Sequence, residues 1–294
     1  MMCFVRRRIS KTNIICYLDI RMMLCLCFIW ISLFAVKHLH AAEVVKNVVG
    51  KGDAVLSGIT PEQARFIALQ KARMDAIQQA TGVKIQGVTL IKDAIMVGQF
   101  LNAYARGRIL DERQNWTDER IPQKDGPPIF NYKVEITVSV AIPSKNIDQG
   151  FWLDARLNRD NFLSGDKATI TIEVSKKASI AVFNLRADDR VMMLYPDSDR
   201  EQYRVIEPKV PFQFPPPDLG ADMVMSTLKG HDRHTELFMV LAVPVQTSKP
   251  IRFLDHFQPK DLYTVPEFYK RYHRFAEQAD EKILIYEVRK KQEQ

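Results

Sequence analysis

Apolar residues recur at helical spacing after Thr60, and this pattern is the clearest helix signal in the chain. The positions on one face are Leu69, Ala72, Ala76, Ile77 and Ala80. Thr60 and Gln63 match a Thr-x-x-Gln capping box, Pro61 suits the first turn, and Gly82 fits the position after the last turn. Because so many of the apolar residues are alanines, we expect this helix to pack closely against a sheet.

Strand patterns surround this helix. The expected β segments are Val44–Leu56, Val83–Ile91, Arg106–Trp116 and Ile129–Ile142, while Lys92–Ala105 fits either a helix or a strand. Val44–Leu56 is either a strand pair or one long strand, interrupted by Gly50 and Gly52. Residues 123–128 have turn composition. One helix on an antiparallel sheet predicts an α+β domain.

In most of the remaining chain, apolar and polar residues alternate as they do in β-strands. The segments are Ala168–Val174, Ala178–Leu185, Val191–Tyr195, Leu237–Val245 and Ile283–Val288. Residues 186–190 have hairpin composition. Five prolines between Pro208 and Pro217 exclude regular structure there and favour an extended crossing of a sheet edge. A late helix is expected from Pro266, with an apolar stripe of Phe268, Tyr272, Phe275 and Ala279. The fold class is therefore α+β: a helix-on-antiparallel-sheet domain, then a mainly-β sandwich with one C-terminal helix.

The N-terminal 42 residues have the pattern of a leader. Basic residues precede an apolar run at Met22–Val36, which is shorter than the roughly 20 residues of a membrane-spanning helix. We expect a Sec-type signal peptide cleaved near Ala41-Ala42; an uncleaved anchor is the alternative. Translation could begin at Met1 or at Met22 or Met23. The predicted parts are thus a signal peptide at 1–42 and domains at 43–148 and 149–294.

Charge and cysteine content support export and weaken a nucleic-acid function. Residues 1–42 hold six of the 42 Lys/Arg and one of the 35 Asp/Glu, so the remainder is nearly neutral and we expect no nucleic-acid partner. All four cysteines (Cys3, Cys16, Cys25 and Cys27) also lie there. Cleavage would therefore leave no disulfide, thiolate nucleophile or Cys-ligated zinc. These features predict a periplasmic or secreted protein.

Two stretches resemble known bacterial families. The run from Thr60 to Gly82 and the later YKVEITVSVAIP resemble the N-terminal domain of flagellar assembly protein T and related envelope proteins. The C-terminal half resembles the domain-of-unknown-function (DUF) family 4384. The segments that carry this second resemblance are Leu157–Asp166, Ala178–Asn184, Val191–Pro196, Leu237–Ala242 and Lys282–Val288. Where that family usually has an Asp-Gly turn, this chain has Asp188-Asp189-Arg190. The resemblances imply an envelope location and an assembly or accessory function, without a catalytic residue set.

Three patterns partly match chemical sites, and each favours a structural interpretation. Residues Gly50–Asp53 lack phosphate-loop spacing and indicate a turn or bulge. Residues Asp197–Glu201 alternate acids as calcium loops do, but Gln202 replaces the required glycine. His231 and His234, with Glu236 nearby, could bind zinc on a helix, but the local sequence predicts a loop with exposed histidines. The exposed aromatics Phe151, Trp152 and Trp116 could bind a ligand.

The sequence therefore predicts no catalytic, cofactor-binding or metal-binding residues, and no cofactor. We expect a non-enzymatic envelope protein that binds or assembles other envelope components, of identity unknown. Membrane contact would occur only through an uncleaved signal segment. The alternatives are a periplasmic ligand- or carbohydrate-binding module and a hydrolase with an unrecognised site.

Overall fold

The structure is a computed structural model that describes residues 43–82, 107–124, 126, 128–142, 150–198, 201, 204–245 and 250–291. The described residues belong to one compact unit. Residues 43–142 form its N-terminal half and residues 150–291 its C-terminal half. The predictions for Met22–Val36, Val83–Ile91 and Lys92–Ala105 lie outside the described residues, and so does the predicted domain boundary near residue 148.

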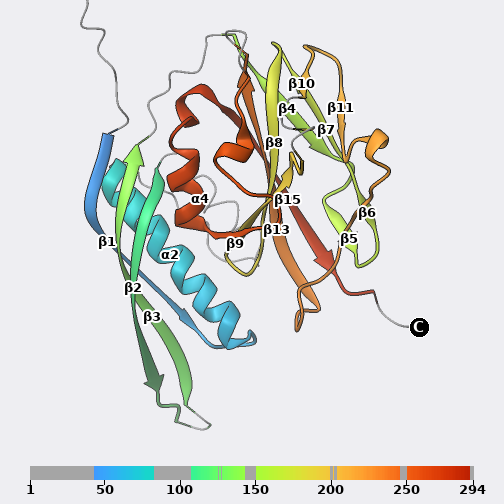
Figure 1. The fold of residues 1–294 in the computed structure, drawn as a ribbon. Helices are drawn as coiled ribbons and strands as arrows, with labels where there is room; N and C mark the ends of the chain where they lie inside the picture. Colours follow the sequence, from blue (N-terminus) through green and yellow to red (C-terminus); the bar gives the residue numbers. More distant parts are fainter. Residues whose placement is uncertain are drawn as a thin grey trace, which may run out of the picture. The chain divides into compact units, whose positions relative to one another are not determined.

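The N-terminal half is a helix on a three-stranded antiparallel sheet. Its elements are β1 (Glu43–Val55), α2 (Pro61–Thr81), β2 (Arg108–Ile121) and β3 (Ile129–Ile142), and the strand order is β1-β3-β2. Helix α2 lies along one face of this sheet (Figure 1). Ile136, Val138 and Val140 of β3 face the helix side and are fully or almost fully buried.

The predicted helix boundaries are confirmed. The Thr60 hydroxyl accepts a hydrogen bond from the Gln63 amide, and the Gln63 side chain accepts one from the Thr60 amide. At the other end Gly82 has φ 67°, a left-handed conformation that ends the helix with little strain. Ala72 and Ala76 are completely buried, as the alanine pattern predicts.

Gly50 and Gly52 lie inside strand β1, and the expected turn or bulge at these residues is wrong. The register of β1 on β3 is continuous from Val48 to Val55, with the irregularity between Val45 and Val48 instead. A Cβ atom on Gly50 would lie 2.1 Å from the Ala72 carbonyl oxygen, and one on Gly52 would lie 2.0 Å from that of Ala68. The glycines therefore let the helix backbone come close to the strand.

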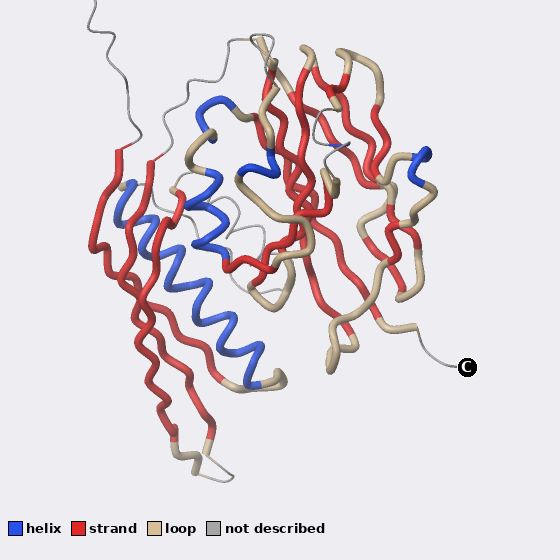
Figure 2. The backbone as a smooth tube through the Cα atoms, viewed as in Figure 1, coloured by secondary structure: helices blue, strands red, loops and turns tan. Residues whose placement is uncertain are grey.

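The C-terminal half is built of strands in two facing sheets. The larger sheet has the order β14-β9-β8-β13-β15-β5, with β10 also on β8; the smaller has the order β11-β7-β4, and β12 pairs with β6 separately. Their bounds are β4 (Leu153–Leu157), β5 (Asn161–Leu163), β6 (Lys167–Ala168), β7 (Ile170–Val174), β8 (Ala178–Leu185), β9 (Arg190–Tyr195), β10 (Val205–Ile206), β11 (Phe212–Phe214), β12 (Met223–Val224), β13 (Arg233–Pro244), β14 (Leu262–Thr264) and β15 (Asp280–Arg289). Figure 2 shows these strands in red.

Strand β13 is buried on both faces, which explains its nearly continuous apolar sequence. Phe238 and Val240 belong to the core between the two sheets. Met239 and Leu241 point the other way, into a second core that also contains α2 and the N-terminal sheet. The two halves of the chain therefore share one buried cluster.

Helix α4 (Val265–Tyr272) fills this shared core. Its Phe268 and Tyr272 are fully buried, and Phe268 packs edge-on against Phe183 at 5.0 Å between ring centroids. The helix also contacts β2, where the Arg108 guanidinium lies 4.9 Å from the Tyr272 ring centre. The expected apolar stripe is too long, because α4 ends at Tyr272 and Ala279 follows a separate 3-10 turn that leads into β15.

The proline-rich stretch contains a little regular structure. Residues Phe212–Phe214 form β11, which pairs with β7 as the outer strand of the smaller sheet. A single 3-10 turn follows at Pro217–Leu219. An outer strand tolerates neighbouring prolines because one of its sides needs no partner, so the expected extended edge crossing is confirmed and the exclusion of all regular structure is wrong.

The predicted fold class is confirmed. The chain is α+β, with an N-terminal helix on a small sheet, a β-sandwich, and a C-terminal helix. Within the described part of the chain, no helix is both long enough and apolar enough to cross a membrane.

Candidate functional site

A pocket of about 400 Å³ lies where the two halves of the chain meet. One wall is the N-terminal part of α2, with Trp116 of β2 beside it, and the opposite wall is the β8–β9 turn and the start of β13. Pockets of this size between structural units commonly bind ligands or peptide side chains. We call it the junction pocket.

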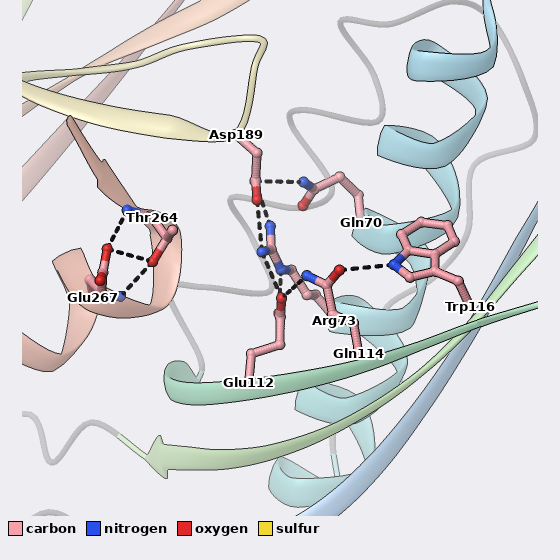
Figure 3. Close-up of polar contacts among 8 residues, drawn as sticks. All are labelled: Gln70, Arg73, Glu112, Gln114, Trp116, Asp189, Thr264 and Glu267. Carbon is pink, nitrogen blue, oxygen red and sulfur yellow. Dashed lines mark hydrogen bonds and ion pairs between the residues drawn. The ribbon is translucent and has the colours of Figure 1, made fainter.

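The apolar wall of the junction pocket follows from helical spacing. Phe66 and Leu69 are three positions apart on α2, so both face the pocket, and Leu69 is buried. Trp116 is partly buried, and its Nε1 donates a 2.9 Å hydrogen bond to Gln114 Oε1 (Figure 3). The Arg65 guanidinium lies 5.8 Å from the centre of the indole ring. The indole is therefore held from its edge and from one side.

A cluster of charged side chains from α2, β2 and the β8–β9 turn adjoins the pocket, and Figure 3 shows these side chains pointing toward one another. Arg73 of α2 is almost completely buried and donates to both carboxylate oxygens of Glu112, at 2.6 and 3.0 Å. It also donates to both oxygens of Asp189, at 2.5 and 2.8 Å. Gln70, one turn earlier, donates to Asp189 Oδ1 at 3.2 Å. Asp189 lines the pocket, so this cluster fixes one of its corners.

The turn that carries Asp189 has unusual backbone geometry for its residues. Asp189 has φ 62°, in the left-handed region that glycine adopts most easily. The turn is closed by a 2.8 Å hydrogen bond from the Arg186 amide to the Arg190 carbonyl. An aspartate is therefore compatible with this hairpin, and its carboxylate gains the ion pair to Arg73 that glycine could not make.

A second polar network supports the opposite wall. Glu236 accepts hydrogen bonds from Tyr286 Oη at 2.7 Å and Asn184 Nδ2 at 2.9 Å, and Nε2 of His234 lies 3.2 Å from Glu236 Oε1. Burial alone would raise the pKa of Glu236, but these partners outweigh it and lower the pKa below its ordinary value. Glu236 also accepts from the Ala187 amide at 3.4 Å, which ties the network to the β8–β9 turn.

The structure brings some of the sequence candidates together and separates others. Trp116, His231 and His234 all line the junction pocket. The expectation of exposed histidines is wrong for His234, which is 4% exposed because the start of β13 is covered on both faces. Phe151 is likewise buried, in the core of the sandwich, while Trp152 is exposed and does not line the pocket.

The two metal candidates are not assembled into ligand sets in the described part of the chain. His231 and His234 have ring centroids 6.2 Å apart and face each other edge-on. In the acidic stretch, Asp199 and Arg200 lie outside the described residues. Glu201 is buried and faces Arg204 at 3.5 Å, so its carboxylate has a basic partner.

Sequence reasoning missed the buried cluster of Arg73, Glu112 and Asp189. The available signal was that Gln70 and Arg73 are polar, three residues apart, within an otherwise alanine-rich helix face. Glu112 and Asp189 are 39 and 116 positions from Arg73, so no local pattern connects them.

No protein-family model matches the chain, and no curated protein matches it significantly. The resemblances to flagellar assembly protein T and to DUF family 4384 therefore remain expectations from the sequence.

Proposed function

We propose that the protein is a non-enzymatic accessory factor of a bacterial envelope complex, flagellar or secretion-like. It would bind another envelope protein through the junction pocket. The observation that supports this proposal is the apolar wall of Phe66, Leu69 and Trp116 beside a rigid corner made by Arg73 and Asp189. A preformed apolar pocket with a few fixed polar groups is typical of a binding site.

The buried polar groups around the pocket favour binding over catalysis. His234 accepts a 3.4 Å hydrogen bond at Nδ1 from the Leu228 amide, and its Nε2 faces Glu236. Nδ1 is thus occupied by the protein backbone, and Nε2 lies 3.2 Å from a carboxylate oxygen of the protein. Arg73 and Asp189 likewise bind each other. These side chains hold the walls in position and do not present a base to a substrate.

The envelope location is proposed from the leader. Basic residues and an apolar run precede Ala41-Ala42, and cleavage there would leave a chain that begins at Ala42 or Glu43. N-terminal sequencing of the protein from a periplasmic fraction tests this step. A start at Ala42 or Glu43 supports export with cleavage, whereas retention of residues 22–36 would contradict it.

A photo-crosslinking experiment in cells tests the binding site itself. The photoreactive residue p-benzoylphenylalanine would replace Phe66 in the pocket or, as the control, Trp152, which is 43% exposed outside it. We expect one discrete crosslinked product with a partner protein from position 66, and no product of the same mass from position 152. The adduct should disappear when Leu69→Asp is added in a chain shown to be folded. Equal labelling from both positions would contradict a specific site.

The second candidate is a periplasmic ligand- or carbohydrate-binding module. The position of Trp116 in the junction pocket favours it, because an aromatic ring offers a large apolar face to a ligand. In that case position 66 would give no protein adduct, and a small-molecule screen would raise the melting temperature. The hydrolase alternative has no supporting observation among the described residues.

A further inference from the structure

Among the charged side chains that line the junction pocket, one carboxylate takes part in no ion pair within the described residues. Four charged lining residues have ionic partners: Arg65 with Asp118, Arg233 with Glu287, Asp188 with Arg186, and Asp189 with Arg73. The fifth is Glu62, in the first turn of α2. Among the described residues no base forms an ion pair with it. Arg65 and His231 act on this carboxylate through space and lower its pKa, but neither forms an ion pair with it. Glu62 is therefore the carboxylate of the pocket lining to which an incoming base can pair directly.

Glu62 remains ionised near neutral pH. A hydrogen bond from its own backbone amide and one from the Thr60 hydroxyl lower the pKa of this carboxyl below its ordinary value. Its place in the first turn adds the favourable field of the helix N-terminus. The side chain is exposed at the mouth of the pocket, where an incoming group can reach it.

The neighbouring side chains suit an apolar body that carries a cation. Phe66, Leu69 and Trp116 supply apolar area, and His231 adds another ring at the rim. Arg65 already lies over the Trp116 ring, which shows that a guanidinium fits against this wall. An acidic ligand would instead approach the Glu62 carboxylate with unfavourable charge.

We propose that the partner segment entering the junction pocket carries a basic residue next to an apolar or aromatic one. The base would pair with Glu62, and the apolar side chain would pack on Phe66, Leu69 and Trp116. This inference rests on the proposed function, since it names the chemistry of the partner at the same site.

Three short peptides serve as probes: acetyl-Lys-Phe-Lys-amide, acetyl-Gly-Phe-Gly-amide and acetyl-Glu-Phe-Glu-amide. The chain has three tryptophans, so Trp30→Phe and Trp152→Phe leave Trp116 as the single fluorescent reporter, inside the pocket. Titration of this full-length protein at low salt measures the dissociation constant of each peptide. The peptides contain no tryptophan and therefore do not disturb the signal.

We expect the lysine peptide to bind about fivefold more tightly than the glycine peptide, as one solvent-exposed ion pair allows. The glutamate peptide should bind most weakly. Glu62→Gln should remove the preference for lysine over glycine without preventing glycine-peptide binding. Glu135→Gln removes a carboxylate of β3 that does not line the pocket, so it should leave the preference unchanged.

Equal binding of the three peptides would overturn the inference, and so would a lysine preference that survives Glu62→Gln. Absence of binding by all three peptides at millimolar concentration would also overturn it. The proposed function is judged separately by the crosslink at position 66. A discrete adduct at position 66, together with equal affinity for the three peptides, would reject the inference of a basic partner segment and leave the proposed function standing.

Discussion

The Arg73 guanidinium and the Asp189 carboxylate form a bidentate ion pair, with nitrogen–oxygen distances of 2.5 and 2.8 Å. The pair joins helix α2 of the N-terminal half to the β8–β9 turn of the C-terminal half. Planar guanidinium and carboxylate groups in this arrangement restrict both distance and orientation. It therefore fixes the position of the turn beside the junction pocket.

Replacing Asp189 by glycine tests which of two opposing effects is larger. Glycine relieves the left-handed backbone at φ 62°, but it leaves Arg73 with Glu112 as its remaining carboxylate in this cluster. Because Arg73 is almost completely buried, we expect Asp189→Gly to lower the free energy of unfolding by about 1–3 kcal/mol. Urea denaturation measures this change.

Asp188→Asn is the matched control. Asp188 lies in the same turn but is 39% exposed and pairs only with Arg186 in the described residues, so we expect a change within about 0.5 kcal/mol. An Asp189→Gly protein as stable as the original would mean that relief of backbone strain fully offsets the loss of the ion pair.

Gly50→Ala tests the close contact between β1 and α2. The added methyl would meet the Ala72 carbonyl oxygen at 2.1 Å, so the helix must move away from the sheet. We expect a loss of about 1–3 kcal/mol or more in unfolding free energy, as overpacked cores show. Lys51→Ala, at the exposed position between the two glycines, should change stability little. Unchanged urea denaturation for Gly50→Ala would show that the helix packs elsewhere.

The buried Glu236 carboxylate should make the free energy of unfolding depend on pH. Its pKa in the folded protein lies below the ordinary value of 4.5, so its contribution is fully present above that pH and is lost as pH falls further. Glu236→Gln weakens hydrogen bonds from Tyr286 and Asn184, at an expected cost of about 1.5–3 kcal/mol at pH 7. The difference in unfolding free energy between Glu236→Gln and the original protein should become smaller below pH 4.5.

Chemical denaturation at several pH values between 3 and 7 measures this difference. Glu135→Gln removes a half-exposed carboxylate of β3 and serves as the control for a general charge effect. A stability gap for Glu236→Gln that stays constant over the whole range would exclude an ionised Glu236 as the source.

Local patterns were sufficient to predict the elements that depend on neighbouring residues. The capping box at Thr60 and Gln63 and the glycine at position 82 set the limits of α2. Strand β3 matches its predicted limits, Ile129–Ile142, because its alternating residues face a core on one side. In each case the residues that determine the element are close together in sequence.

Contacts between distant segments could not be predicted in this way. Gly50 carries a turn signal, yet its lack of a side chain serves the approach of Ala72 on a helix that comes later in the chain. The local sequence around His234 predicts an exposed loop, whereas this residue lies in strand β13, paired with Val288 of β15, and is buried. The role of Gly50 and the burial of His234 both depend on which strands and helices contact one another. The local sequence carries only a weak signal for such tertiary contacts.

The last prediction concerns metals and redox state. We expect that neither EDTA nor a reductant changes the melting temperature of the exported protein. Cleavage near Ala42 would remove all four cysteines, so a reductant would have no disulfide to reduce. In the described residues no group of histidines and acids has the geometry to hold a metal.

Differential scanning calorimetry with and without EDTA tests this expectation. A bound metal at a hundredfold excess over its dissociation constant adds about 2.7 kcal/mol, and its removal should lower the melting temperature by about 5 °C or more. His231→Ala and Asp199→Ala distinguish the two candidate sites, because each removes one potential ligand. If EDTA lowers the melting temperature and one of these variants abolishes the effect, that site binds a metal. In either case a metal-dependent function would replace the proposed accessory function.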